Sequence, residues 1–422
     1  MREPPCGGFP WGTRQNWTLT IIMSLIKNNS IFQYIAVLLI IAMSGAHVIL
    51  GLYVPINLLL IMFLAYSFFF YKHQKGKINK WPLISLIVIV LWIIIEQKII
   101  NIAYDNYYYQ YIIFYVGTFL IVSAISFDDF VRKLLSCIKW LSLISIIINE
   151  LYWAELIAGK YYADVLSSGI TVSAYIFNMG WGSQNRLASI FWEPGQYQII
   201  LNFTLILCSN DIIDLLKEHR YMILIKKYII LIVALMLTKS TAGYIAFGII
   251  CIYVMFNVLD KRKIGQVIIV TAFCVTCVSV LLNSDVVQEK FAQKNETRDT
   301  SYSIRMMDNL GLLRMIQERP IVGYGIQTKS FQRRAYAIDN RTSSNGWLNA
   351  GAQLGLPFLI FLLFSVWYGL KNMFRDRRMI CICFVVVIVA QANEAAYALP
   401  FLSLFLFRFK AMKEKQHAYL NR

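Results

Sequence analysis

The sequence predicts an all-α, multi-pass membrane protein with about 12 transmembrane helices and one large outer loop. Two observations predict this class. The 422 residues are 58% hydrophobic and 15% charged, and their mean hydropathy is +0.57, which excludes an ordinary soluble domain. Apolar stretches close to the ~20 residues that a helix needs to cross a bilayer recur from Ile31 to Lys410, and only the connection 284–344 between them is long.

The expected spans divide the chain into segments. We expect transmembrane helices near residues 31–50, 52–71, 81–99, 110–126, 138–155, 194–209, 226–239, 243–259, 265–283, 346–370, 379–394 and 397–410. The seventh and the twelfth are short, so they could instead form a re-entrant pair or half-helices. The membrane helices therefore occupy residues 23–283 and 345–410, the large outer loop is 284–344, and 411–422 form a cytoplasmic tail.

Residues 1–22 differ in composition from the rest of the chain. They are rich in Pro, Gly and Arg, whereas the following sequence is rich in Ile, Lys, Asn and Tyr. No cleavable signal pattern is present, because no small-residue cleavage site follows the apolar run. We interpret this segment as an extension upstream of a natural start at Met23.

The distribution of Lys and Arg places both termini in the cytoplasm. Cytoplasmic loops of membrane proteins are enriched in these residues. With both termini inside, the short outer segments hold only Lys98, Lys160, Arg186 and Lys239. Cytoplasmic anchoring to anionic lipid accounts for most of the net charge of +17, so no nucleic-acid partner is expected.

The large outer loop, 284–344, is the exception to this asymmetry, because it holds ten Lys and Arg. Arg305 and Arg314 lie within an apolar pattern of helical spacing, which predicts an amphipathic helix on the membrane surface or capping the bundle. Gly323 and Gly325 then turn the chain. Guanidinium groups bind phosphate oxygens in a bidentate manner, so an anionic ligand is one interpretation and a solvated surface is the other.

Three further positions could face the same outer side. Glu193 precedes Pro194 at a predicted helix start, where it either caps the helix or holds a carboxylate that orients or deprotonates a hydroxyl group. Lys239 and Ser240 open another helix, which is either an anion site or a tight helical hairpin. Asn345 either faces the outer cavity or is a helix N-cap.

The sequence points to no metal ion and no cofactor. No Asp-x-Asp pair lies on the outer side, because Asp128 and Asp129 fall on the cytoplasmic side, and His47 is the one histidine near the outer face. No cytosolic nucleotide-binding domain is visible, so any substrate must arrive already activated. The cysteines lie mostly in or beside apolar stretches, which argues against a disulfide framework.

Taken in order, these segments resemble the O-antigen polymerase and O-antigen ligase superfamily of bacterial inner-membrane glycosyltransferases. The resemblance covers roughly residues 180–365. Its motifs are Arg186 with Phe191-x-Glu193-Pro194, Leu237-Thr238-x-Ser240 with Gly243, Arg305 followed by Pro320-x-x-Gly323-x-Gly325, and Asn345 through Gly355. Arg314 and Gly325 also fit an Arg-x10-Gly pattern of some polymerase loops.

The resemblance implies a fold like that of lipid-carrier glycosyltransferases and a glycan donor on undecaprenyl diphosphate at the outer leaflet. It implies no metal. Arg186, Lys239 and Arg305 would contact the diphosphate, together with Arg314, while Glu193 would act on the acceptor hydroxyl group. Ser240, Gly323, Gly325 and Asn345 would contribute to substrate binding. The implied partners are the lipid-linked donor and acceptor, membrane lipids, a chain-length regulator and a flippase.

Two departures from the family pattern bear on the activity. Thr241 replaces an Arg that often follows the Ser of the second motif, and Ser344 replaces a His that ligases carry before Asn345. The missing His favours a polymerase over a ligase. A lipid-linked oligosaccharide flippase is the main alternative outside the enzymes, although no internal two-fold repeat is visible. A scaffold of the export machinery is a more distant alternative.

Overall fold

The computed structural model describes residues 29–100, 107–162, 172–181, 185–258, 301–337, 345–374, 376–392, 394 and 396–410. Several sequence predictions lie outside these residues. They are the extension 1–22 and its start at Met23, the expected span 265–283, the ends of the outer loop including Ser344, and the tail 411–422.

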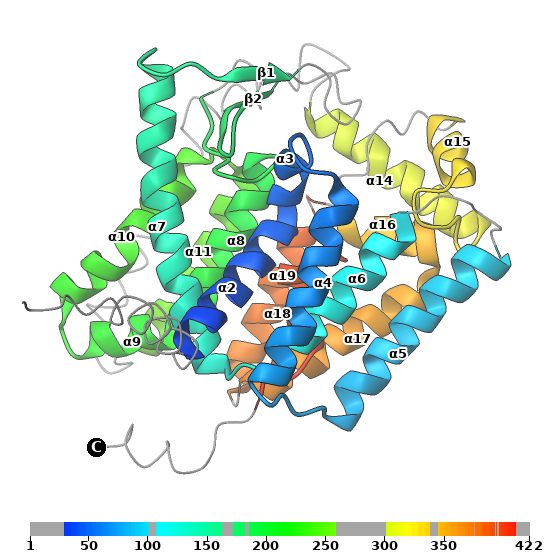
Figure 1. Ribbon diagram of the computed structural model, residues 1–422, viewed down its shortest axis with the longest axis horizontal. Helices are drawn as coiled ribbons and strands as arrows, with labels where there is room; N and C mark the ends of the chain where they lie inside the picture. The colour runs from blue at the N-terminus through cyan, green and yellow to red at the C-terminus, as the bar shows by residue number, and fades with distance from the viewer. Residues whose placement is uncertain are drawn as a thin grey trace, which may run out of the picture.

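The described chain is mainly helical (Figure 1). Its α-helices are α2 (Asn29–Ile41), α3 (His47–Leu50), α4 (Ile56–His73), α5 (Lys80–Ile94), α6 (Tyr107–Val122), α7 (Phe127–Trp153), α8 (Pro194–Leu207), α9 (Ser209–Lys217), α10 (Tyr221–Leu237), α11 (Thr241–Val258), α14 (Ser301–Glu318), α15 (Lys329–Ala337), α16 (Gly346–Leu354), α17 (Leu356–Met373), α18 (Arg377–Gln391) and α19 (Pro400–Ser403). Shorter turns are the π-helical η1 (Ala42–Ala46) and η2 (Ile95–Ile100) and the 3-10 turn η4 (Leu404–Leu406).

Six described helical segments are long and apolar enough to cross a membrane. They are Ser30–Leu50, Ile56–His73, Lys80–Ile100, Phe127–Trp153, Thr241–Val258 and Leu356–Met373. The pair α8 and α9, bent by 51°, raises the number to seven if it forms one span. The chain is therefore a multi-pass membrane protein, but the described residues do not reproduce the twelve spans expected from the sequence.

Two of the expected spans differ clearly from the helices in the described chain. The expected span 346–370 is broken at Gly355, whose φ of +86° ends α16 and starts α17 in a new direction. The expected span 397–410 is helical only over α19 and η4, which are too short to cross a bilayer. Irregular backbone at membrane depth is tolerated where protein surrounds it, and Phe401 and Phe405 are fully buried.

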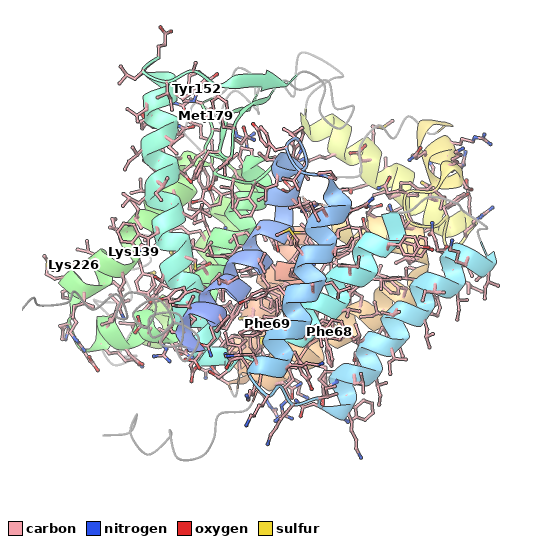
Figure 2. The ribbon with its side chains drawn as sticks, in the orientation of Figure 1. Phe68, Phe69, Lys139, Tyr152, Met179 and Lys226 are labelled. Atoms are coloured by element: carbon pink, nitrogen blue, oxygen red, sulfur yellow. The ribbon has the colours of Figure 1, made fainter. Side chains whose placement is uncertain are left out.

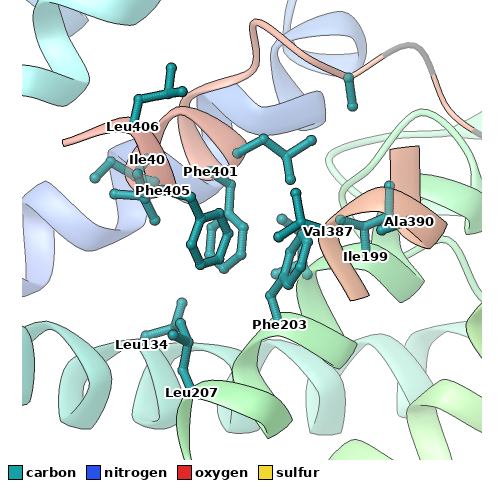
Figure 3. Close-up of a cluster of buried hydrophobic side chains, with 14 of the residues drawn as sticks. Ile40, Leu134, Ile199, Phe203, Leu207, Val387, Ala390, Phe401, Phe405 and Leu406 are labelled. Atoms are coloured by element: carbon teal, nitrogen blue, oxygen red, sulfur yellow. The ribbon is translucent and has the colours of Figure 1, made fainter. Parts of the chain in front are cut away.

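The core of the bundle forms around these short C-terminal turns. Phe203 of α8 stacks on Phe401 with ring centroids 6.0 Å apart and tilts against Phe405 at 4.9 Å (Figure 3). Each aromatic pair contributes about 0.5–1.5 kcal/mol beyond its area burial. Gly369 of α17 lets the backbone of η4 approach closely, because a Cβ there would collide with the Phe405 carbonyl oxygen.

A small antiparallel sheet lies in the connection between α7 and α8, which the all-α prediction did not include. Its strands are β1 (Lys160–Tyr162), β2 (Val172–Ala174) and β3 (Asn178–Trp181), in the order β1-β2-β3. Met179 of β3 and Tyr152 lie at one end of the molecule, and Lys139 and Lys226 lie farther from that end, about midway along the molecule (Figure 2). We refer to the end that holds the sheet as the sheet end.

The segment predicted as the large outer loop, 284–344, contains α14, which packs across α16. Leu312, Met315 and Ile316 of α14 are buried in one small hydrophobic cluster. Gly351 of α16 permits the close approach, because a Cβ there would lie 3.0 Å from Ile316 Cδ1. The predicted helix therefore exists and packs on α16 through this face, but apolar side chains such as Met307 and Leu310 are also exposed, so it is not clearly amphipathic.

Candidate functional site

The segment 185–193, which leads from the sheet into α8, is held by hydrogen bonds from several elements. The Leu187 amide donates to the Leu237 carbonyl at 2.9 Å, and the Asn178 amide donates to the Ser189 carbonyl at 2.6 Å. Ser189 adopts a left-handed φ of +59°, and its hydroxyl group lies 2.7 Å from that of Ser145 on α7. These contacts hold a backbone conformation that costs of order 1–3 kcal/mol, which is typical of functional segments.

Arg186 is fixed at the end of α10. Its Nε donates a hydrogen bond to the Thr238 carbonyl oxygen at 3.1 Å, so the two sequence motifs that contain these residues meet in space. Burial lowers the pKa of Arg186, while the carboxyl groups of Glu193 and Glu394 raise it and the Arg305 guanidinium lowers it. Both carboxyl groups and a second guanidinium group are therefore near enough to Arg186 to act on it electrostatically.

Glu193 is the N-cap residue of α8, but its side chain does not cap the helix. The backbone is extended there, with φ −143° and ψ 157°, and the side chain accepts no hydrogen bond from the first turn. The Glu193 carboxyl group is close enough to Glu394 to raise the pKa of that acid. Glu193 is thus near a second acid and does not cap the helix with its side chain.

Glu394 lies in the turn between α18 and α19, and it is 8% exposed. Burial raises the pKa of its carboxyl group well above the ordinary value, and the neighbouring Glu193 raises it further. The Arg305 and Arg186 guanidinium groups act in the opposite direction. Arg305 sits in the first turns of α14, so segment 284–344 supplies the second cation of this group.

We name Arg186, Glu193, Arg305 and Glu394 the carboxyl–guanidinium cluster. It draws on the segment before α8, on α14 and on the turn after α18, so residues that are far apart in the sequence meet in one place. Two guanidinium groups provide planar, bidentate sites for phosphate oxygens. Two carboxyl groups beside them can accept or hold a proton. The cluster can therefore bind an anionic group and act on an adjacent hydroxyl group.

Lys239 and Ser240 directly follow Thr238, the residue that accepts a hydrogen bond from Arg186 of the cluster. Lys239 has a left-handed φ of +48° directly after Thr238, the residue whose carbonyl oxygen binds Arg186. Ser240 is buried, and its hydroxyl group accepts a long hydrogen bond from the Gly243 amide at 3.4 Å in the first turn of α11. The sequence motif is thus both a helix start and a neighbour of Arg186.

Asn345 and the two glycines have structural roles in the described chain. The Asn345 side chain caps α16, accepting from the Trp347 and Leu348 amides at 3.1 Å each. Gly323 and Gly325 have φ of +65° and +84°, and the Gly325 amide donates to the Gln353 carbonyl at 2.8 Å. The turn therefore satisfies carbonyl groups at the end of α16.

Arg314 is exposed on α14, and the structure does not bring it to Arg305. The two residues are nine positions apart, which corresponds to about two and a half turns of helix and places them on opposite faces. His47 is buried, with Nε2 3.1 Å from the Gln110 side-chain nitrogen. Among the described residues, no group of three or more His, Cys, Asp or Glu side chains is arranged to hold a metal ion.

The region from α10 to α17 matches a known protein family. A family model described as O-antigen ligase covers residues 228–363. The match confirms the resemblance to the O-antigen ligase and polymerase superfamily. Lys239, Ser240, Arg305 and Asn345 lie within the matched residues of this family, whereas Arg186, Glu193 and Glu394 lie outside them. No curated protein matches the chain.

Glu394 is the one member of the carboxyl–guanidinium cluster that the sequence motifs of the O-antigen ligase family did not indicate. It follows the apolar run of α18 and belongs to no recognisable pattern. One signal could have found it, because an acid at the end of an apolar stretch is expensive to bury and usually has a function.

Proposed function

We propose that this protein polymerises oligosaccharide repeat units carried on undecaprenyl diphosphate, at the outer face of the bacterial inner membrane. The observation that carries the proposal is the carboxyl–guanidinium cluster at one end of a multi-pass helical bundle. The family match supports it, because members of this superfamily are glycosyltransferase-like enzymes that act on lipid-linked sugars. The polymer would be an O-antigen, a capsule or an exopolysaccharide.

In the proposed reaction, an acceptor hydroxyl oxygen forms a bond to the anomeric carbon of the donor sugar. The bond between that carbon and the diphosphate oxygen breaks, and the diphosphate leaves with the electron pair. Glu193 receives the hydroxyl proton, and Arg186 and Arg305 bind the charge that develops on the leaving group. Lys239 and Ser240 lie on the adjoining segment and extend the anion site. The guanidinium groups supply the countercharge, so the scheme uses no metal ion and no cofactor.

The orientation of the bundle supports an outer location for this chemistry. The cluster includes Arg186 and Glu193 of segment 185–193, which follows β3 of the sheet end, while Lys139 and Lys226 lie farther from that end (Figure 2). Loops rich in Lys and Arg are usually retained on the cytoplasmic side of the membrane. In this orientation both termini are cytoplasmic, 284–344 is the outer loop, and α14 carries Arg305 over the outer leaflet, where the lipid-linked donor and acceptor meet the enzyme. A flippase and a chain-length regulator would act beside it.

An O-antigen ligase is the second candidate, because the matching family model carries that description. A ligase would use the same donor but transfer the finished glycan to lipid A. Ser344, where ligases carry His, favours the polymerase.

The test is the surface glycan of a strain that lacks this gene. We expect a single repeat unit on the lipid core in place of a ladder, and restoration of the ladder by the wild-type gene. Bare core with polymer accumulating on the lipid carrier would establish a ligase instead. Bare core with unpolymerised lipid-linked units trapped inside would establish a flippase.

Arg305→Ala tests the cluster within the same experiment. Loss of one guanidinium contact to the leaving group should lower polymer yield by about a hundredfold or more. Arg333→Ala is the matched control, because Arg333 is exposed on α15, outside the cluster. Equal membrane levels of both variants must be verified by immunoblot. A normal ladder with Arg305→Ala would remove this residue from the mechanism.

A further inference from the structure

One side of α7 carries a stripe of buried polar side chains that the proposed reaction does not use. Ser142, Ser145 and Asn149 are spaced by three and four positions, so they lie on one face of the helix. Each is at most 2% exposed. All three lie within the candidate membrane span Phe127–Trp153, where polar groups are costly to bury and usually have a function. We name them the polar stripe of α7.

Each member of the polar stripe of α7 forms a hydrogen bond to the chain that leads from the sheet into α8. The pairs are Asn149 with Asn185 at 3.0 Å, Ser145 with Ser189 at 2.7 Å, and Ser142 with Tyr197 at 2.7 Å. As the residue number on α7 falls, that of the partner rises, so the two chains run in opposite directions. Three such contacts fix the register of the segment, because a shift along α7 would break all of them.

These contacts hold the two predicted site residues of this segment unequally. Asn185 directly precedes Arg186, so the contact from Asn149 fixes the backbone next to this guanidinium group. Glu193 lies four positions from both Ser189 and Tyr197, the nearest partners of the stripe. The position of Glu193 therefore depends on a further contact.

Asn178 of β3 supplies that contact. It is 2% exposed, and its side-chain amide donates to the Trp192 carbonyl oxygen at 2.7 Å and to the Phe191 carbonyl oxygen at 3.3 Å. The Trp192 carbonyl belongs to the peptide group that joins Trp192 to Glu193, so its direction sets the backbone at Glu193. Because α7 packs against both β3 and α8, the stripe and the sheet hold the segment together (Figure 1).

We propose that Asn149 and Asn178 are positioning residues for the two ends of this segment. Asn149 holds Arg186 toward the diphosphate of the donor, and Asn178 holds Glu193 toward the acceptor hydroxyl group. This inference rests on the proposed function and adds to it two residues that lie outside the family motifs. Each acts through its neighbour, because reacting groups must be held within about 0.5 Å of the productive geometry.

Two measurements on the full-length protein in lipid nanodiscs separate these roles. The first is the Kd for farnesyl diphosphate, a short-chain analogue of the leaving group, at one fixed pH. The second is kcat with lipid-linked repeat units extracted from a strain that lacks this gene. Asn178→Ala should lower kcat by up to about a hundredfold, since Glu193 is displaced, and leave the Kd unchanged. Asn149→Ala should raise the Kd by about tenfold, because the charged hydrogen bonds from Arg186 are weakened.

Asn372→Ala is the matched control. It also removes a side-chain amide that donates to a backbone carbonyl, that of Tyr368 at 2.9 Å within α17, and it should change neither value. A purely structural role would reduce the amount of folded protein without separating kcat from Kd. If either alanine variant does not fold, the corresponding serine variant, whose shorter side chain cannot reach the same partner, should show the same change.

The outcomes distinguish this inference from the function on which it rests. If Asn178→Ala and Asn149→Ala change both values alike, or change neither, the positioning roles are overturned while the proposed function stands. A wild-type protein that neither binds farnesyl diphosphate nor joins repeat units would count against the proposed function itself.

Discussion

At the scale of single residues, Gly195 controls where the Glu394 carboxyl group can lie. A Cβ at this position would meet the carboxyl oxygen, which is the movable end of a side chain rather than backbone. Gly195→Ala should therefore displace the acid without unfolding the helix. Because a misplacement of about 1 Å can cost up to a hundredfold in rate, we expect polymer yield to fall by up to about that factor.

Gly248→Ala is the matched control, because nothing lies within 4 Å of a Cβ at that position in α11. Both variants place alanine in a helix, where it is favoured over glycine. Glycan ladders and membrane levels of the two variants are compared side by side. A normal ladder with Gly195→Ala would show that the position of Glu394 has no bearing on the reaction.

The residues of the cluster differ in how far the sequence reveals them. Glu193 and Arg186 are separated by a few positions, and a helix start with Pro194 marks where they lie. Arg305 lies in the predicted outer loop, which is rich in Lys and Arg although these residues are usually retained on the cytoplasmic side. Glu394 belongs to the same cluster only because α18 and α8 pack side by side, and a contact between distant segments leaves no periodic trace in one sequence. Asn345 is the opposite case, because its role depends only on neighbouring residues. The sequence offered a helix cap as one of two interpretations, and the structure shows that cap.

At the scale of elements, α14 matters because it brings Arg305 to the cluster. Its docking on α16 depends on Leu312, which is completely buried. Leu312→Ala should weaken this docking by about 2–5 kcal/mol, as a large-to-small change in a packed cluster does. We expect faster hydrogen exchange throughout α14 and a weaker glycan ladder, because Arg305 is then less firmly placed.

Leu313→Ala is the control for the same element. Leu313 is 43% exposed and is not part of the buried cluster of α14 and α16, so its truncation removes little packing. Helix propensity changes equally in both variants. Unchanged exchange in α14 with Leu312→Ala would mean that the helix is held by other contacts.

Element lengths were predictable where periodicity was uninterrupted. The spans near 31–50, 81–99 and 243–259 correspond closely to described helices. The break within the expected span 346–370 was not predictable. Hydropathy is averaged over many residues, so it does not reveal that Gly355 alone has a positive φ. The last expected span failed for another reason: apolar residues buried in protein and apolar residues facing lipid give the same hydropathy. The seven helical residues of α19 and η4 are buried in the core rather than extended across it.

At the scale of the whole molecule, we infer the orientation from the asymmetry of charge. Lys139 donates a hydrogen bond to the Lys226 carbonyl oxygen at 2.8 Å, so the middle of α7 lies beside the first turns of α10. The sheet lies farther along α7, near Tyr152 (Figure 2). Positive loops are retained in the cytoplasm, so the sheet end should face outward.

Cysteine labelling in spheroplasts tests this orientation. Glu155 and Glu218 are both exposed acids outside the helices, the first between α7 and β1 and the second after α9. In a cysteine-free background, Glu155→Cys should react with a membrane-impermeant maleimide in intact cells, because it lies on the outer side. Glu218→Cys should react only after permeabilisation. The reverse pattern would place the carboxyl–guanidinium cluster in the cytoplasm, away from a donor at the outer leaflet, and the polymerase proposal would then fail even if every residue of the cluster proved essential.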